Sequence, residues 1–391
     1  MKGRINFTDI LIDTTEIPQS DLNIDIRTRT NLFAWNGQFS PQFVEAELKK
    51  YSKPNYFVID PFLGSGTVLY ECARKGLRAY GTELNVSAFY MAKICELCIL
   101  NITDRWSLLF DIDAIINNVL NTSEFIPSLK KIINSATDSK IANILSTLIV
   151  LLDIYNNEAS ANLITDKWSK LREIIIALPY SQNTITVDNG DARCLAIPDD
   201  SADMLLTSPP YINVFNYHQK YRASVEALGY NVLSIAKSEF GSNRKHRSNR
   251  LFTVIQYCID IALSLKEANR VCKENARMIY VVGRESTVLG YSFCNSELVY
   301  NLGSRIFGFD LLLRQERVFK NRYGQMIYED ILHFNNKKTT KLTDNDIILK
   351  ARSIAIESLK SKLSQDNKNL ELLNDAILKA DNIIQSEMHY E

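Results

Sequence analysis

Short apolar runs alternate with amphipathic stretches both before and after residues 101–180. Apolar runs occupy residues 56–60, 77–81, 184–187 and 202–206, and a further one lies at residues 276–283. Their length and their polar or glycine-containing flanks are typical of buried strands, and several of the segments between them have the apolar spacing of helices. Strands that alternate with helices predict an α/β fold with a mostly parallel sheet.

The pattern ends in a predicted hairpin. Residues 308–319 and 325–334 are strand-like, and residues 320–324 between them end in a glycine. This arrangement favours two antiparallel strands joined by a glycine-containing turn at the end of the sheet.

Two other stretches are helical but lie outside this alternation. Apolar residues recur at helical spacing within residues 101–180, whereas a connection in an α/β unit usually needs only roughly 2–6 residues. We therefore expect an inserted helical subdomain, either a contact surface or simply a bundle. Residues 344–388 are charged and contain no glycine or proline, which predicts a docking or dimerisation helix pair without chemistry of its own.

These patterns divide the chain into four parts. They are an N-terminal arm (residues 1–30), an α/β domain (31–100 and 181–335), the helical insert (101–180) and a C-terminal helical extension (336–391).

Composition narrows the class of protein. A hydrophobic content of 46% excludes wholesale disorder, and 45 basic against 45 acidic residues mean that a nucleic-acid binder would need a local basic surface. Seven scattered cysteines and a polar N-terminus without a leader pattern favour a cytoplasmic protein, and we read Cys95 and Cys98 as packing residues. The apolar runs are too short to cross a bilayer, and the four separated histidines indicate no metal site.

A glycine-rich loop follows the first predicted strand. It reads Asp60-Pro61-Phe62-Leu63-Gly64-Ser65-Gly66-Thr67, and Glu83 ends the next strand. Glycines allow close backbone approach to a ligand at the start of a helix, and a carboxylate in this place suits ribose hydroxyls. Leu69 stands where a nicotinamide fingerprint has its third glycine, and the lysine of a phosphate loop is absent. The loop therefore favours a nucleoside ligand with little phosphate.

A second motif, Ser208-Pro209-Pro210-Tyr211, leaves another predicted strand. Two prolines stiffen the exit and end the strand. The Ser208 hydroxyl and a neighbouring carbonyl can accept hydrogens from an amine, and the Tyr211 ring offers a stacking surface for a planar heterocycle.

Together the two motifs resemble the S-adenosylmethionine-dependent amino-methyltransferases of DNA, which carry D-x-F-x-G-x-G-T and (S/D)-P-P-Y loops. The resemblance covers residues 30–100 and 184–335. It implies a Rossmann-like methyltransferase fold with a seven-stranded sheet ending in an antiparallel hairpin, S-adenosyl-L-methionine as cofactor, and Ser208, Pro209, Pro210 and Tyr211 as the catalytic loop. The cofactor-binding residues that it implies are Phe39, Ser40, Asp60, Phe62, Gly64, Ser65, Gly66, Thr67, Glu83, Leu84, Asp191, Ala192 and Ser208.

The implied reaction transfers a methyl group to the exocyclic amine of a base flipped out of duplex DNA. Serine before Pro-Pro-Tyr resembles the cytosine-N4 branch, as found in restriction-modification systems, so we favour cytosine over adenine N6. An RNA base-amine methyltransferase and a non-catalytic DNA-binding subunit stay open as alternatives. A separate cognate restriction endonuclease and a homodimer are further expectations about partners.

Basic residues near the motifs are the candidates for DNA contact. The densest cluster spans residues 242–250, and others lie around the predicted hairpin. Basic side chains interleaved with serine and asparagine suit phosphates and base edges, although a solvated loop has the same composition. The candidates are Arg244, Lys245, Arg247, Arg250, Arg317 and Arg322.

Overall fold

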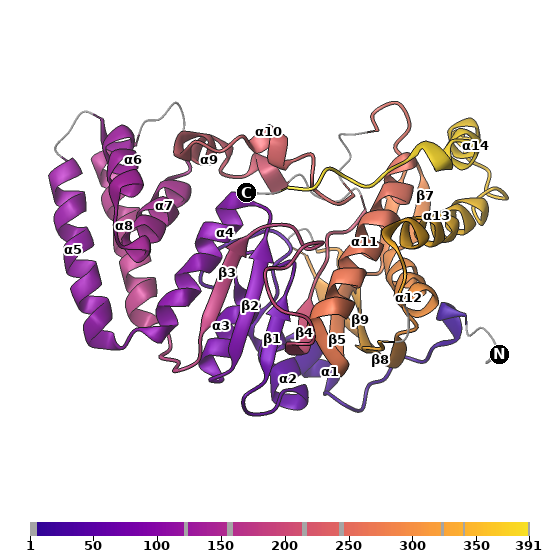
Figure 1. Ribbon diagram of the computed structural model, residues 1–391, viewed down its shortest axis with the longest axis horizontal. Coiled ribbons are helices and arrows are strands. Elements are labelled where there is room, and N and C mark those ends of the chain that lie inside the picture. The colour runs from indigo at the N-terminus through magenta and orange to yellow at the C-terminus, as the bar shows by residue number, and fades with distance from the viewer. Residues whose placement is uncertain are drawn as a thin grey trace.

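A seven-stranded sheet forms the centre of the molecule (Figure 1). The computed structural model describes residues 6–120, 124–154, 159–212, 217–241, 246–321, 324–338 and 341–389. The strand order is β3-β2-β1-β4-β5-β9-β8. The strands are β1 (Phe57–Asp60), β2 (Arg78–Glu83), β3 (Ile185–Asn189), β4 (Ala202–Thr207), β5 (Cys272–Gly283), β8 (Asp310–Lys320) and β9 (Met326–Asn335).

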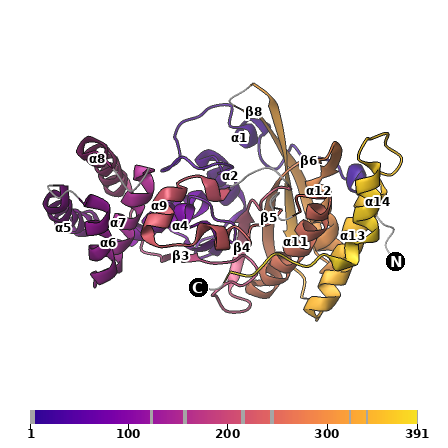
Figure 2. The same ribbon diagram turned by 90° about the horizontal axis from the view of Figure 1, so that it is seen from above.

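The first five strands of this order are parallel, and β9 runs antiparallel between β5 and β8. This confirms the predicted α/β class, the Rossmann-like fold with a seven-stranded sheet and the terminal hairpin. Figure 2 shows β8 and β9 extending beyond the body of the sheet. β5 begins earlier than predicted, and a small hairpin of β6 (Glu285–Val288) and β7 (Tyr291–Cys294), which no sequence pattern indicated, follows it.

Both faces of the sheet are buried, because successive residues of its strands enter two different cores. Val58 packs on one side and its neighbour Ile59 on the other, and Met204 and Leu205 of β4 divide in the same way. The first core is covered by α2 (Pro41–Tyr51), α3 (Thr67–Arg74) and α4 (Val86–Lys93), and the second by α11 (Phe252–Val271), α12 (Asn295–Ile306) and α13 (Asp344–Lys360). Short helices complete the chain at α1 (Gln19–Asn23), α9 (Arg222–Leu228) and α10 (Val232–Ile235).

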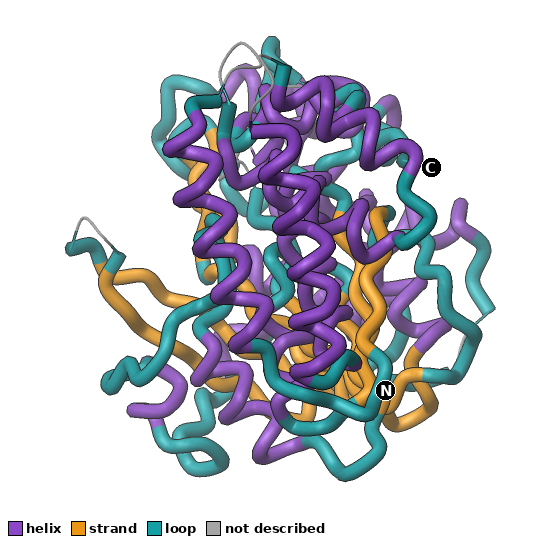
Figure 3. The backbone as a smooth tube through the Cα atoms, turned by 90° about the vertical axis from the view of Figure 1, so that its left-hand side faces the viewer, coloured by secondary structure: helices purple, strands orange, loops and turns teal. Residues whose placement is uncertain are grey.

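The predicted helical insert contains α5 (Ile102–Leu120), α6 (Phe125–Ser135), α7 (Ser139–Leu152) and α8 (Ala161–Ala177). Figure 3 views the molecule from the side where these helices stand together. Helix α7 packs on α4, and the apolar residues of the insert belong to the same core as the sheet. The buried Arg105 donates hydrogen bonds to the carbonyl oxygens of Leu178 and Pro179, which ties the start of the insert to its end.

The C-terminal extension begins with α13 and continues with α14 (Leu370–Leu378). Helix α13 lies against α11 and α12, and Ile347, Ala351 and Ala355 on its apolar face are buried. That face is therefore occupied within its own chain. After α14 and a short 3₁₀ helix at Ala380–Asn382, the chain does not stay helical to residue 388 as predicted, but runs back across the molecule as an extended tail (Figure 1). Within the described ranges no helix combines the length and apolar character needed to cross a bilayer.

A buried polar cluster lies between α2 and the sheet. Glu47 is 0% exposed, and among the described residues neither of its carboxylate oxygens has a hydrogen-bond partner. Burial raises the pKa of Glu47 to about 8, although Arg277 and Arg317 oppose the shift. His333 lies 3.9 Å from Glu47 (Nε2 to Oε2), and burial lowers the pKa of this histidine to about 3. Both side chains are therefore held uncharged in the core at neutral pH.

Glu47→Gln tests this conclusion. Because the folded state binds the Glu47 proton more tightly than the unfolded chain, the wild type loses stability as the pH rises from 4.5 through about 8. Glutamine does not titrate, so the variant should exceed the wild type in free energy of unfolding at pH 8.5 by roughly 2–4 kcal/mol. At pH 4.5 this gain should be absent. Urea denaturation at both pH values measures it.

The control is Glu45→Gln on the same helix. Glu45 forms an exposed ion pair with Arg29, so its effect should be small and similar at both pH values. A Glu47→Gln effect that did not change with pH would contradict the assignment.

Candidate active site

The two sequence motifs meet at the carboxyl ends of β1 and β4, which are neighbouring parallel strands. Asp60 ends β1 and is 1% exposed, and its Oδ1 atom accepts hydrogen bonds from the Thr207 hydroxyl (2.6 Å) and the Phe62 backbone N–H (3.1 Å). Gly64 of the first loop and Ser208 of the second line one cavity. Both loops therefore lie at one edge of the sheet.

The first loop is held against α4 by its glycines. Gly64 and Gly66 have φ angles of +55° and +92°, a region that favours glycine. A Cβ atom at Gly66 would lie 3.0 Å from the Cα atom of Ala92 and 3.2 Å from the Cys95 sulfur. Cys95 and Cys98 are free and buried, and burial raises the pKa of both thiols, so they are packing residues as predicted.

Glu83 lies in the cavity wall at the end of β2. Its two carboxylate oxygens accept hydrogen bonds from the backbone N–H groups of Gly64 (2.7 Å) and Asn85 (2.8 Å). Burial raises the pKa of Glu83 to about 7, and these N–H groups limit the shift. Burial likewise raises the pKa of Asp60 to about 7. The cavity thus contains carboxylates that a hydrogen-bond donor or a cation would stabilise in their ionised form.

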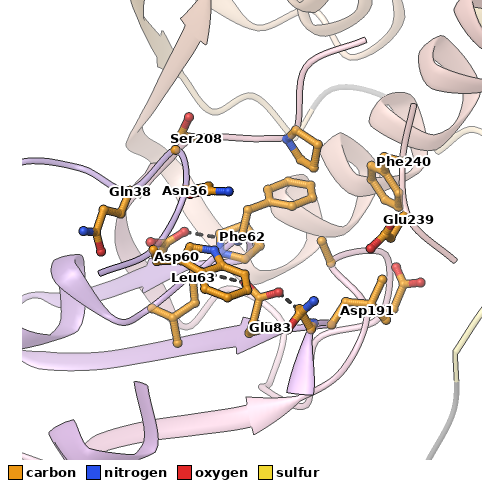
Figure 4. A pocket seen from close by; sticks show the side chains of 18 of the residues that line it. Asn36, Gln38, Asp60, Phe62, Leu63, Glu83, Asp191, Ser208, Glu239 and Phe240 are labelled. Carbon is orange, nitrogen blue, oxygen red and sulfur yellow. Dashed lines mark hydrogen bonds between the residues drawn. The ribbon is translucent and has the colours of Figure 1, made fainter. Parts of the chain in front are cut away.

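Figure 4 shows how the side chains are distributed around the cavity. Ser208, Asn36 and Gln38 lie at one end, and Asp191, Glu239 and Phe240 at the other. Phe62 and Glu83 lie between them. The arrangement gives an elongated site with a polar end and a mixed aromatic and acidic end.

Asp191 lines the cavity as predicted, but its carboxylate is already engaged. Arg193 binds both oxygens of Asp191, at 2.8 Å from Nε and 2.5 Å from Nη2, and lies 3.0 Å from Asp260. The same guanidinium donates hydrogen bonds to the backbone carbonyl groups of Ser386 and Glu387 in the C-terminal tail. The tail therefore supports this end of the cavity, a role that no sequence pattern indicated.

The segment before α2 lies over the first loop. Gln38 accepts a hydrogen bond from the Ser65 hydroxyl (2.6 Å), and Asn31 donates one to the Thr67 hydroxyl (2.8 Å). Of the residues predicted to bind the cofactor, the following line the cavity: Phe39, Asp60, Phe62, Gly64, Thr67, Glu83, Leu84, Asp191, Ala192 and Ser208. Ser65 and Gly66 instead face neighbouring segments of the protein.

A second hollow of about 770 Å³ adjoins the first cavity. Four residues line both spaces, namely Gly37, Gln38, Phe39 and Ser208. Ser40 lines the second hollow only, together with residues of the β8–β9 hairpin. Pro210 lines the first cavity, whereas Pro209 and Tyr211 line neither space.

The basic residues predicted to contact DNA occupy different environments. Arg317 is 7% exposed in its side chain, lies over the Phe43 and Phe319 rings, and faces Glu329 at 3.4 Å in the wall of the second hollow. The Arg317 guanidinium is therefore buried and paired, and it does not lie on an exposed surface as a residue that contacts DNA would. Arg247 is exposed, and Arg250 is half-buried in the turn just before α11. The other three candidates, Arg244, Lys245 and Arg322, lie outside the described residues.

Several lining residues had no signal in the sequence. Ile235, Glu239 and Phe240 come from a short helix and an irregular segment, where neither periodicity nor a motif indicates what they face. Phe240 lies edge-on to Phe62 with ring centroids 5.5 Å apart. Only its place in the fold brings it to the cavity. Three or more His, Cys, Asp or Glu side chains in a metal-binding arrangement do not occur among the described residues.

Comparison with known proteins points to one family. Residues 6–93, which include the first loop, match the model of the DNA methylase family (N6_N4_Mtase). A stretch of 51 residues is 39% identical to the type II methyltransferase M.MjaII of Methanocaldococcus jannaschii. This stretch is 13% of the chain and 10% of that relative, so the chain covers only a tenth of its length. The two matches confirm the resemblance drawn from the motifs.

Solved structures show more distant likenesses. TrmN from Thermus thermophilus is 14% identical with a TM-score of 0.35, covering 77% of this chain and 50% of its own. An S-adenosylmethionine-dependent methyltransferase from Methanosarcina mazei is 12% identical with a TM-score of 0.36, covering 74% and 96%. The strand order of the sheet, rather than either likeness, defines the fold.

Removal of the Arg193 side chain tests how much the buried cluster that Arg193 forms with Asp191 and Asp260 contributes to the stability of the protein. Arg193→Met leaves Asp191 and Asp260 buried without their cation, so we expect the free energy of unfolding to fall by roughly 3–5 kcal/mol. Arg222→Met removes an exposed ion pair on α9 and should change it by less than about 1 kcal/mol. Chemical denaturation compares the two, and equal effects would show that the buried cluster contributes nothing special.

Proposed function

We propose that this chain is an S-adenosylmethionine-dependent DNA methyltransferase that modifies an exocyclic amine of a flipped base, with cytosine N4 as the favoured acceptor. One observation carries the proposal, namely that a cavity with a nucleoside-type loop and a second hollow meet at Ser208. A methyl donor in the first space and a base in the second would face each other across this residue.

The first cavity suits the cofactor by its chemistry. Glu83 has the place and the carboxylate needed to accept hydrogen bonds from ribose hydroxyls, and Phe62 and Phe240 offer apolar surface for a purine. Asn36 and Gln38 supply polar groups for the amino-acid end. Acidic side chains around the cavity also complement a cation. When bound, the cofactor supplies a methyl group that its sulfonium has already activated.

The protein would contribute orientation. An exocyclic amine is a poor nucleophile because its lone pair is delocalised into the ring. Hydrogen bonds from the amine to the Ser208 hydroxyl and to a carbonyl in the Pro209 region would localise the lone pair and direct it at the methyl carbon. Orientation of this kind is worth at most roughly 7–11 kcal/mol. The stiff Pro-Pro backbone holds both acceptors in place before the base arrives.

The second hollow would hold the base after it leaves the duplex. Its rim carries the exposed Arg27 and Lys320, which suit the flanking phosphates. We favour cytosine because serine precedes Pro-Pro-Tyr in this chain, as in the cytosine-N4 branch of the family that it resembles. Adenine N6 is the second candidate, since its amine has a similar geometry.

Transfer of a labelled methyl group from S-adenosylmethionine tests the function. We expect label in duplex DNA and none in tRNA, and Ser208→Ala should abolish most of the transfer. Ser201→Ala, which alters a hydroxyl on the approach to β4, is the matched control and should leave transfer unchanged. Digestion of the DNA to nucleosides then separates N4-methylcytosine from N6-methyladenine. Label in RNA alone, or in neither substrate, would overturn the proposal.

The affinity for the cofactor should depend on pH through Glu83. Its pKa of about 7 in the free protein means that much of the carboxyl is protonated below neutrality, where it accepts hydrogen bonds poorly. Affinity should therefore rise from pH 6 to pH 8 and then level off, with a slope of up to about tenfold per pH unit on the acidic side. Glu83→Gln should bind about 10–100-fold more weakly.

Isothermal titration with S-adenosylhomocysteine measures both effects. Glu226→Gln, which alters an exposed carboxylate on α9, should keep the wild-type affinity and pH profile. If Glu83→Gln bound as tightly as the wild type, Glu83 would not be a cofactor ligand.

A further inference from the structure

A line of hydrogen bonds leads away from Ser208. The Ser208 and Tyr211 hydroxyl oxygens are 3.4 Å apart, and the Tyr211 hydroxyl donates to Oε1 of Glu329 at 3.0 Å. Glu329 lies on β9, 118 residues beyond Tyr211, and its side chain is 13% exposed in the wall of the second hollow. Neither the motifs nor the family match, which ends at residue 93, includes this carboxylate.

The sheet holds the Tyr211 ring in this position. A Cβ atom at Gly283 would lie 2.6 Å from Cε2 of Tyr211, so the ring rests directly on the β5 backbone. Gly283 and Glu329 are register partners in the β5–β9 ladder. The ring therefore contacts one residue of this pair while its hydroxyl binds the other. Such a site requires both a residue without a side chain and a carboxylate opposite it.

Arg317 completes the arrangement from the other side. It is the register partner of Glu329 in the β8–β9 ladder, and its Nη1 atom lies 3.4 Å from Oε2 of Glu329. One oxygen of Glu329 thus faces Tyr211 and the other faces a guanidinium. The other charged side chains that line this hollow are Asp25, Arg27 and Lys320.

We propose that Glu329 receives, through Tyr211 and Ser208, the proton that the substrate amine loses on methylation. This inference rests on the proposed function. The amine nitrogen forms a bond to the methyl carbon as the carbon–sulfur bond breaks and its electron pair goes to sulfur. As this bond forms, the nitrogen gains positive charge and releases one proton in the same step. That proton passes to Ser208 Oγ, the Ser208 proton to Tyr211 Oη, and the Tyr211 proton to Glu329 Oε1.

A carboxylate is a sufficient base for this step. A methylated exocyclic amine that still holds both its protons cannot share its lone pair with the ring, so it is a strong acid. Arg317 faces Oε2 of Glu329, so Oε1 is the oxygen that receives the proton from Tyr211. Because the second hollow opens to solvent, the carboxyl can release the proton to water after each cycle.

The rival interpretation is that Glu329 only anchors the Tyr211 loop. An anchor and a proton acceptor differ in their pH dependence. If Glu329 accepts the proton, the rate of the methyl-transfer step falls at acidic pH as this carboxylate becomes protonated, and Glu329→Gln lowers the rate and removes that fall. If Glu329 is an anchor, its loss alters stability or substrate affinity and leaves the shape of the pH profile unchanged.

The test is single-turnover methyl transfer to duplex DNA as a function of pH, at saturating S-adenosylmethionine so that the titration of Glu83 does not contribute. Glu329→Gln should slow the step by about 10–100-fold at neutral pH, at or below the usual range for general-base catalysis because water in the hollow can substitute. Tyr211→Phe keeps the ring on Gly283 but interrupts the line, so it should show the same loss. The double variant should be no slower than either single one.

Glu316→Gln is the matched control. Glu316 is a neighbouring carboxylate on β8 that pairs with Arg284 and lines neither the cavity nor the hollow. It should keep the wild-type rate and profile. A Glu329→Gln profile with the wild-type shape in an enzyme that methylates DNA would overturn the relay alone. Absence of transfer by the wild type would overturn the proposed function and the relay with it.

Discussion

The rest of the site depends on the hydrogen bond between Asp60 and Thr207, which joins its two loops. The chain builds β1, β2 and β3 outward in one direction and then returns to place β4 on the other side of β1. At such a reversal, the loops that leave the two central strands diverge and open a crevice above the sheet. Asp60 and Thr207 close the floor of this crevice at 2.6 Å, with Asp60 fully enclosed. The two loops are therefore fixed relative to each other before any ligand binds.

This geometry gathers acidic side chains. Asp60, Glu83, Asp191 and Glu239 all line the same cavity, and among them, within the described residues, only Asp191 forms an ion pair with a buried arginine. Burial raises the pKa of Asp60 and of Glu83 to about 7, because the ionised form of a carboxyl group is less stable where little solvent surrounds it. A cationic ligand with hydroxyl donors would reverse both effects at once. The electrostatics of the free protein are thus those of a site that is completed by its ligand.

Those parts of the site that depend on local chemistry could be predicted from the sequence. Gly64 and Gly66 could be found because their φ angles and close contacts admit few other residues, and Ser208 because two prolines mark its loop. The parallel order followed from the alternation of strands and helices. Glu239 and Phe240 could not be found, since their position depends on how an irregular segment folds over the sheet. We expected Arg317 at a DNA surface because its positive charge is visible in the sequence. Its partner Glu329 is not, because the pairing depends on the register of the hairpin.

Segments outside the motif-bearing domain contact residues that support the same site. The helical insert shares a core with α4, the helix against which Gly66 packs, and Arg105 closes the insert on itself. The C-terminal tail binds Arg193, which in turn holds Asp191. Figures 1 and 2 show the insert and the C-terminal helices at opposite ends of the molecule, with the sheet between them. The proposed function calls for a cofactor cavity that keeps its shape when a base enters the second hollow, and these contacts suit that requirement. The second hollow itself is lined in part by residues of the β8–β9 hairpin.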